Sequence, residues 1–326
     1  MAYTTIDKPS DYFETVLWSS VDTSIDTLDF QPDWVWIKSR TNADTQVLFD
    51  SVRGAGERLS SSSTGAESTK TDELTAFNSD GFTLGTGSNV NRASNNNVAW
   101  SWKETADAGF DIVSYTGNAT IRTISHSLSA VPNWMIIKCR SEDGHSWKVY
   151  HKSIGATKTL ALQGTGTPDD DANYHNDTEP TSSVFTVGSN GDVNDDGETF
   201  IAYLFAEKQG YSKFGSYIAN ANANGIFEYT GFKPAFLLIK NTSQATDWIM
   251  YDNKREGYEP QNKEFRANTN AAERNAEDNN VQFCANGFKV RNAGTKSNAD
   301  SGDNLIYIAF AEQPLVTSTG IPATAR

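Results

Sequence analysis

The stretch FQPDWVWIKSR at residues 30–40 recurs as VPNWMIIKCR at 131–140 and as FKPAFLLIKN at 232–241. Each copy gives a proline, an aromatic residue, an apolar run and Ile-Lys in the same order. The copies lie about 100 residues apart, and self-similarity at a fixed spacing is typical of chains built from repeated structural units. The sequence therefore predicts three related units, at residues 1–107, 108–209 and 210–314, followed by a C-terminal arm at 315–326.

The apolar run after each proline predicts a strand that is buried on both faces. Residues 34–37, 134–137 and 236–239 are apolar without alternation, and many of them are aromatic or branched. A proline is tolerated at the start of such a strand, where its missing N–H is not needed. A two-sheet sandwich buries only one face of each sheet. A neighbouring unit, a long loop or a second subunit must therefore cover the other face.

The remaining segments of each unit also have the character of strands. In the first unit, alternating residues 12–18 predict a half-buried strand, and residues 47–50 predict a hairpin with the proline strand. Residues 81–85 and 98–102 predict a second hairpin, and no segment keeps a helical apolar spacing. We expect an all-β chain of three tandem antiparallel β-sandwich repeats, jelly-roll or concanavalin-like, joined by polar surface loops.

Composition and charge exclude several classes of function. The chain has 326 residues, 11% of them aromatic, and a net charge of −14. Aromatic residues at this frequency can build cores, whereas the negative charge argues against binding of nucleic acids or anionic lipids. The first residues lack the basic and apolar regions of a signal peptide, and no stretch approaches 18 apolar residues, so neither secretion nor membrane insertion is expected. Cys139 and Cys284 occupy different places in their repeats, which predicts free thiols.

Enzyme signatures are missing from the sequence. It has no GxSxG, HExxH, CxxC or Walker-type motif, and its four histidines lack metal-ligand spacing. We therefore expect a protein that is not an enzyme. A polysaccharide depolymerase remains an alternative, because the two carboxylates of a glycosidase have no short motif.

One segment matches the first half of a calcium-binding loop. Asp192, Asn194 and Asp196 offer oxygens at loop positions 1, 3 and 5, and a glycine follows at position 6. The twelfth position is Tyr203, so the bidentate carboxylate is missing. The sequence favours a plain turn and leaves calcium as a weaker alternative; no other cofactor is expected.

Four aromatic residues are candidates for contact with a glycan. Trp147 and Trp248 occupy matching positions in the second and third units, where the first has Gln46, and Tyr174 and Tyr258 lie in long polar loops. An exposed aromatic ring can stack on a sugar. The alternative is that these rings pack beneath their own loops.

Repeated charged residues suggest ion pairs between strands. A lysine ends each proline strand and a glutamate follows each closing strand. If the two strands are neighbours, we expect three equivalent pairs; the alternative is solvated charges at the strand ends. The expected pairs are Lys38 with Glu104, Lys138 with Glu207, and Lys240 with Glu312.

A second charged pattern, Asp-x-x-Arg, occurs at Asp50 and Arg53 and again at Asp252 and Arg255. Both copies directly follow a predicted strand. An arginine can bind a carboxylate through two parallel hydrogen bonds, so each pair is expected to fix the base of the loop that follows.

The motifs of the first unit, FQPDWVWIKSR, LFDSVRGAGERL, SSSSTGAES, FNSDGFTLG and NVAWSWKE, resemble a repeat of structural proteins from tailed bacteriophages, especially marine ones. The second unit departs from the pattern at His151, where the others have Asp50 and Asp252, and at Val184, where they have glycine.

The resemblance implies a lectin-like or tail-fibre-like sandwich protein of the virion, made in the host cytoplasm. Its expected role is that of a tail-fibre, tail-tip or capsid-surface component. The implied partners are other virion proteins, a second copy of the chain and a glycan of the host surface. The alternative function is that of a glycan-binding lectin or a polysaccharide depolymerase.

Overall fold

Three large antiparallel sheets with one common strand order form the protein. The computed structural model describes residues 2–19 and 24–323. We call the segments that carry the three sheets modules 1, 2 and 3. In sheet order, the strands are β1 (Phe13–Ser19), β9 (Asn96–Trp102), β3 (Trp34–Ser39) and β4 (Val47–Asp50) in module 1; β10 (Phe110–Thr116), β17 (Thr199–Phe205), β12 (Trp134–Cys139), β13 (Lys148–His151), β14 (Lys158–Ala161) and β15 (Asp169–Asp170) in module 2; and β18 (Ser212–Ile218), β26 (Asn304–Pro314), β20 (Phe232–Asn241), β21 (Ile249–Asp252), β22 (Lys263–Arg266) and β23 (Arg274–Asn275) in module 3.

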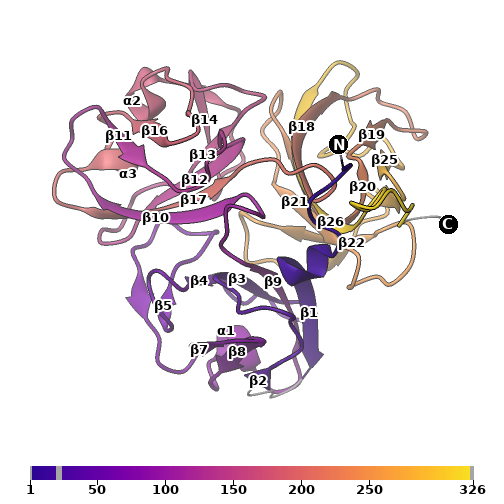
Figure 1. Ribbon diagram of the computed structural model, residues 1–326, viewed down its shortest axis with the longest axis horizontal. Coiled ribbons are helices and arrows are strands. Elements are labelled where there is room, and N and C mark those ends of the chain that lie inside the picture. Colours follow the sequence, from indigo (N-terminus) through magenta and orange to yellow (C-terminus); the bar gives the residue numbers. More distant parts are fainter. Residues whose placement is uncertain (1, 20–23, 324–326) are drawn as a thin grey trace.

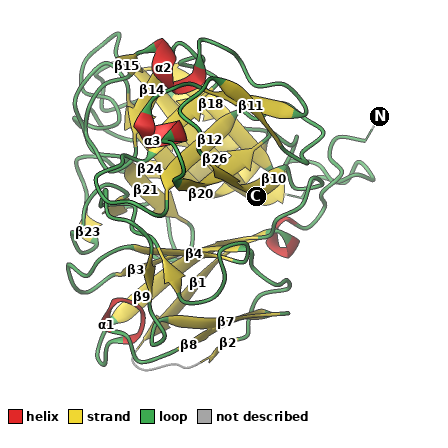
Figure 2. Cartoon of the chain, turned by 90° about the vertical axis from the view of Figure 1, so that its left-hand side faces the viewer, coloured by secondary structure: helices red, strands yellow, loops and turns green. Residues whose placement is uncertain are grey.

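A small sheet packs on each large one, which gives the two layers visible for module 1 in Figure 2. The predicted all-β class is thereby confirmed. The predicted second hairpin is wrong, because its first strand lies in the small sheet and its second in the middle of the large one. The small sheets contain β2 (Ser24–Ile25), β8 (Gly81–Leu84) and β7 (Leu74–Asn78); β11 (Arg122–Ser125) and β16 (Val184–Val187); and β19 (Phe227–Tyr229), β25 (Gly287–Val290) and β24 (Val281–Cys284).

Short elements complete the fold. Strands β5 and β6 of module 1 form a separate two-stranded sheet beside β4. The helices of the described residues have three or four residues each and lie in turns. They are too short to show the apolar spacing that would predict a helix. These elements are β5 (Glu57–Arg58), β6 (Ser68–Thr69), η1 (Pro9–Asp11), α1 (Ser88–Asn91), α2 (Ala172–His175) and α3 (Gly191–Asn194).

The three modules surround one axis, with module 1 at the bottom, module 2 at the upper left and module 3 at the upper right of Figure 1. The predicted unit boundaries fall in the connections between β9 and β10 and between β17 and β18. Equivalent rings of the three closing strands contact one another between the modules. The ring centroids of Trp102 and Phe310 are 5.6 Å apart, those of Phe205 and Phe310 5.7 Å, and those of Trp102 and Phe205 6.5 Å.

The proline strands are buried on both faces, as predicted. In β3, Trp34 and Trp36 belong to a core shared by all three modules, whereas Val35 and Ile37 face the small sheet of their own module. Alternate residues of β12 and β20 divide in the same way. The second face of each strand is thus covered by the neighbouring modules.

The shared core makes the modules mutually dependent. Trp34 of module 1 stacks on Tyr203 of module 2, with ring centroids 4.7 Å apart and planes 23° apart. Such pairs contribute about 0.5–1.5 kcal/mol beyond the burial of their area. A module taken alone would expose this aromatic face to water, so the three modules form one body rather than three separate domains.

The C-terminal segment folds back instead of extending. The Ser318 amide donates to Asp7 Oδ1 at 2.6 Å, the Leu315 amide donates to the Gly231 oxygen at 3.2 Å, and Tyr3 Oη donates to that same oxygen at 2.7 Å. Residues 315–323 of the predicted C-terminal arm are thus bound to the rest of the chain; residues 324–326 lie outside the described part. These contacts join the N-terminal segment to module 3 and close the ring of modules.

Candidate functional site

Each repeated lysine is buried and holds a loop of the neighbouring module. Lys38 Nζ donates to the Asn270 oxygen at 2.7 Å, and Lys138 Nζ donates to the Thr64 oxygen at 3.2 Å. The contacts run in one rotational sense, from module 1 to 3, from 2 to 1 and from 3 to 2. Burial lowers the pKa of each ammonium group to about 8, and the carbonyl dipoles around it favour its charged form. In the third contact, Lys240 Nζ donates to the Thr165 oxygen at 2.9 Å.

The predicted lysine–glutamate pairs are wrong. The lysines Lys38, Lys138 and Lys240 bind carbonyl groups, and the three glutamates have other partners. Glu104 accepts the Ile112 amide at 3.0 Å, and burial raises its pKa to about 7. The other two glutamates pair with lysines at the module surface: Glu207 with Lys152 at 2.6 Å, and Glu312 with Lys233 at 2.9 Å.

The two candidate tryptophans are interface residues and not exposed platforms. Trp147 and Trp248 are 0% exposed. Trp147 Nε1 donates to the oxygens of Ser60 and Ser63 in module 1, at 2.8 and 3.0 Å, and Trp248 Nε1 donates to the Ala161 oxygen of module 2 at 3.1 Å. The prediction that these two rings bind a glycan is therefore wrong, and the serine-rich loop after β5 covers a neighbour.

Gln46 takes the same place at the contact between modules 1 and 3, where its Nε2 donates to the Arg266 oxygen at 2.6 Å. A side chain that donates from this position thus occurs in every module. The side chains of Gln46, Trp147 and Trp248 each donate to backbone carbonyl groups in a loop of the neighbouring module. These hydrogen bonds satisfy oxygens that would otherwise be buried without partners.

The two candidate tyrosines differ in exposure. Tyr174 is buried, and its hydroxyl accepts a hydrogen bond from Lys148 Nζ at 2.8 Å. Tyr258 is 67% exposed and lines a hollow of about 340 Å³ together with Lys233 and Glu259. Of the four glycan candidates, Tyr258 alone has an accessible ring.

The calcium candidate is contradicted by the way its oxygens are used. Asn194 is buried in α3, where its Oδ1 accepts the Asn118 amide at 3.1 Å and its Nδ2 donates to the Gly188 oxygen at 2.8 Å. Asp192 Oδ1 accepts the Ser146 amide at 2.7 Å, and Asp196 is exposed. Two of the three candidate ligands therefore already bind protein groups, and the segment forms the short helix α3 where the sequence favours a plain turn.

A different set of metal-ligating groups lies nearby. One nitrogen of His145 and one oxygen each of Glu142 and Asp195 lie within 4.8 Å of one another. The His145 ring already contacts Glu142 at 3.2 Å, and Glu142 and Asp195 extend toward solvent. Spacing along the sequence does not reveal this group, because its members come from two separate loops.

A buried ionic network spans the contact between modules 1 and 2. Arg53 binds Asp50 within its own module, which confirms the predicted Asp-x-x-Arg pair. Arg53 Nη1 also binds Glu67 at 3.0 Å, and Glu67 in turn binds Nη2 of Arg140 from module 2 at 2.9 Å. At the bottom of the network, Tyr203 Oη of module 2 donates to Asp50 Oδ2 at 2.6 Å.

The contact between modules 1 and 3 contains the same network. Arg255 binds Asp252 and also Glu273, the latter at 3.2 Å, and Glu273 binds Nε of Arg40 from module 1 at 2.9 Å. Trp100 Nε1 takes the place of the tyrosine hydroxyl and donates to Asp252 Oδ2 at 3.0 Å. Two of the three contacts are therefore joined by an Arg–Glu–Arg bridge above a buried aspartate.

The third contact, between modules 2 and 3, lacks the whole bridge. Ile154 lies three residues after His151, as Arg53 lies after Asp50, and Pro168 directly precedes β15, as Glu67 precedes β6. The Thr242 amide donates to the Asn304 oxygen, just as the Arg140 amide donates to the Thr199 oxygen, so Thr242 occupies the arginine position. All three charged positions of the bridge therefore hold uncharged residues at this contact.

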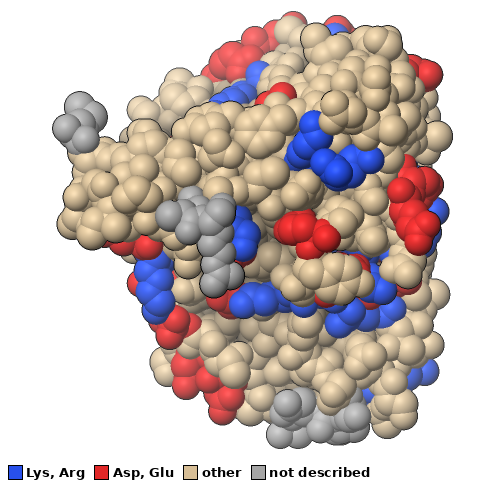
Figure 3. All heavy atoms as spheres, turned by 90° about the vertical axis from the view of Figure 1, so that its right-hand side faces the viewer, with Lys and Arg blue, Asp and Glu red and all other residues tan. Residues whose placement is uncertain are grey.

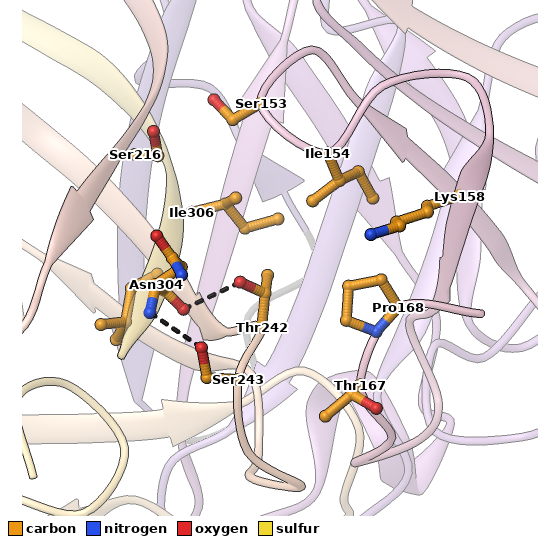
Figure 4. A pocket seen from close by; sticks show the side chains of 11 residues that line it. Ser153, Ile154, Lys158, Thr167, Pro168, Ser216, Thr242, Ser243, Asn304 and Ile306 are labelled. Carbon is orange, nitrogen blue, oxygen red and sulfur yellow. Dashed lines mark hydrogen bonds between the residues drawn. The ribbon is translucent and has the colours of Figure 1, made fainter. Parts of the chain in front are cut away.

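His151 replaces the buried aspartate of the other contacts. Its Nε2 lies 3.3 Å from the Tyr307 oxygen, and its Nδ1 accepts the Ser153 amide at 3.1 Å. Burial lowers the pKa of this imidazole to about 3, so the ring is neutral at pH 7. Above it a hollow of about 460 Å³ takes the place of the bridge, and Ile154, Pro168 and Thr242 are part of its lining (Figure 4).

The sequence of residues 8–314 matches a family described as a domain of unknown function, DUF7483. The chain belongs to this family. The match extends through all three modules, which agrees with a unit held together by one shared core. No curated protein matches the chain.

The outer surface has a mixed character. On the face shown in Figure 3, acidic and basic side chains are interspersed and most of the visible surface is uncharged. Among the described residues, no helix is long and apolar enough to cross a lipid bilayer.

Proposed function

We propose that this chain is a structural component of a tailed-bacteriophage particle, acts without catalysis and binds other virion proteins. Support comes from the resemblance of its strand motifs to those of phage structural proteins. The fold gives a physical reason, because three related modules around an axis present related surfaces in three directions.

The observation that carries the proposal is the central cluster of Trp102, Phe205 and Phe310. These rings fix the angles between the modules, so the surfaces that the modules present cannot move independently. A rigid body of this kind suits a partner with threefold symmetry or a tightly packed shell. It would bind such a partner through the same side of each module.

The polar residues that recur in the modules also favour this role over catalysis. The buried lysines bind carbonyl groups, and the arginines bind carboxylates at module contacts. Their chemistry is used to hold the protein together. The burial of Trp147 and Trp248 removes the main support for the lectin alternative.

Gold-labelled antibody against the purified chain, applied to particles of the phage that encodes it, tests the proposal. We expect label at one place on intact particles, and its position would distinguish tail from capsid. Absence of the chain from purified particles would overturn the proposal. Release of reducing ends from host polysaccharide by the purified chain would also overturn it, in favour of a depolymerase.

A further inference from the structure

The hollow between modules 2 and 3 has a lining unlike that of the matching places in the other two contacts. There the space is occupied by two arginines and a glutamate, whereas here smaller residues stand at all three positions. Replacement of one member would have left buried charges without partners, at a cost of several kcal/mol. The combined replacement avoids that cost and leaves an open space of about 460 Å³, within the usual range of small-molecule sites of about 300–1,000 Å³.

The floor and the rim of the hollow differ in chemistry. Ile154 and Ile306 lie at its centre in Figure 4, with Pro168 beside them. Hydroxyl, amide and ammonium groups surround this aliphatic floor. The polar side chains of the rim are Ser153, Lys158, Thr167, Ser216, Thr242, Ser243 and Asn304.

Several rim groups are free to bind a ligand. Thr242 donates to the Asn304 oxygen at 2.8 Å, and Ser243 accepts the Asn304 amide at 2.9 Å, so these two hydroxyls are engaged. Within residues 2–19 and 24–323, no hydrogen bond or ion pair engages the side chains of Ser153, Ser216 or Lys158. Their donors can therefore bind a ligand without breaking a contact of the protein.

Charge restricts the ligand further. Lys158 is the only ionised side chain of the described lining, in a chain whose net charge is −14. The nearest acids along the chain, Asp169 and Asp170, are exposed on β15 outside the lining. Asp170 lies opposite Lys158 in the β14–β15 register, but within the described residues no ion pair joins their side chains. The hollow thus offers one positive charge, several hydroxyls and an aliphatic floor.

We propose that this hollow binds a carboxylated sugar, with a hexuronic acid residue as the basic unit. A sugar ring has an apolar C–H face that suits the isoleucine floor and hydroxyls at its edge that suit Ser153 and Ser216. Its carboxylate pairs with Lys158. Tyr258 is not part of this lining, and the existence of the site does not depend on a role of the chain in a virus particle.

Titration of the purified chain with methyl glucuronide, methyl glucoside and propionate, followed by ligand-observed NMR, tests this site. We expect the glucuronide to bind about twofold to fivefold more tightly than the glucoside, because an exposed ion pair with Lys158 contributes up to about 1 kcal/mol. Propionate should bind weakly, because it lacks the ring. Equal binding of glucuronide and glucoside would overturn the assignment, as would no binding of either.

Variants locate the site. Lys158→Gln should remove the preference for the glucuronide, whereas Lys152→Gln, which changes a nearby lysine outside the lining, should leave it intact. The double variant Pro168→Glu with Thr242→Arg restores two members of the bridge and should abolish binding. Ser216→Phe fills the opposite wall and serves as a second blocking variant if the first does not fold. Undiminished binding by a folded blocking variant would overturn the proposal.

Discussion

The contact between modules 1 and 2 and the contact between modules 2 and 3 share the same hydrogen bonds to backbone carbonyl groups but differ in their ionic bridge. In both, a buried lysine and a tryptophan bind carbonyl groups of the neighbour. Only the first adds the bridge of Arg53, Glu67 and Arg140. The buried lysine is thus common to all three contacts, with Gln46 in place of the tryptophan between modules 1 and 3. The ionic bridge, in contrast, occurs at two contacts, and all its members are absent from the contact between modules 2 and 3.

The largest effect is expected from Arg53→Ala. This substitution leaves the buried Asp50 without its cation and removes one of the two arginines that bind Glu67. Breaking a buried pair on one side typically costs about 3–5 kcal/mol. Urea denaturation at pH 7 measures the loss. The matched control is Ile154→Ala at the same place in the third contact, where no charge is orphaned and a loss under about 2 kcal/mol is expected. Equal losses at the two sites would contradict the distinction between the contacts.

A smaller effect is expected from Lys138→Met, which keeps most of the apolar stem but removes the ammonium group. The Thr64 and His145 oxygens then lose their donor, and hydrogen bonds to a charged group contribute about 1.5–3 kcal/mol. Lys240→Met in the third contact should lose the same amount, because its surroundings are equivalent. A much larger loss of stability for Lys240→Met would show that the contact between modules 2 and 3 depends more on its lysine than the other contacts do.

Acid should weaken module 2 through its buried histidines. Burial lowers the pKa of His151 to about 3 and that of His175 to about 4, whereas an unfolded histidine titrates near 6.5. The unfolded state therefore binds the extra proton first, and stability falls as the pH drops below about 6.5 and continues to fall until the folded-state pKa is reached.

Between pH 7 and pH 5 each histidine should account for a loss of about 1–2 kcal/mol, since one pKa unit corresponds to about 1.4 kcal/mol. Thermal unfolding at a series of pH values measures it. The variant His151→Gln should lose less stability over this interval than the unchanged chain. An identical pH dependence for both would argue that His151 is not buried in a neutral form.

The smallest effect is expected from Glu207→Gln. The pair of Glu207 with Lys152 is about one-third exposed on each side, and exposed ion pairs contribute about 0–1 kcal/mol. The loss should be reduced further by 1 M salt, which screens surface charges. A loss above 2 kcal/mol, independent of salt, would mean that this surface pair supports the contact as strongly as the buried bridge.

The sequence predicts the strands well because the order of apolar and polar residues indicates which faces of a strand are buried. The unbroken apolar run at 34–37 indicates a strand covered on both sides, and the structure confirms it. The identity of the covering surface is not in the pattern, since Trp34 is equally compatible with a neighbour, a loop or a second subunit. The hairpin prediction is wrong for the opposite reason. Segments that are close along the chain need not pair, and β9 pairs with the distant β1 and β3.

The errors at the candidate site have a related origin. The acceptors of Lys38 and Trp147 are backbone carbonyl groups, which every residue carries, so no sequence motif marks them. The ionic bridge did leave a signal. Arginine follows the repeated Lys-x pair at positions 40 and 140 but not at 242, and glutamate occurs at 67 and 273 where Pro168 stands in the second repeat. That shared departure indicates one altered contact.

The continuity of the chain explains how one contact can differ from its two counterparts. In an assembly of three identical subunits, any replacement is copied into every interface, so a change that suits one location must be tolerated at all of them. Here His151 is encoded once and meets a single surface, that of Tyr307. Because the three modules are covalently linked in one chain, each contact can differ in its residues while the other two contacts keep the common arrangement.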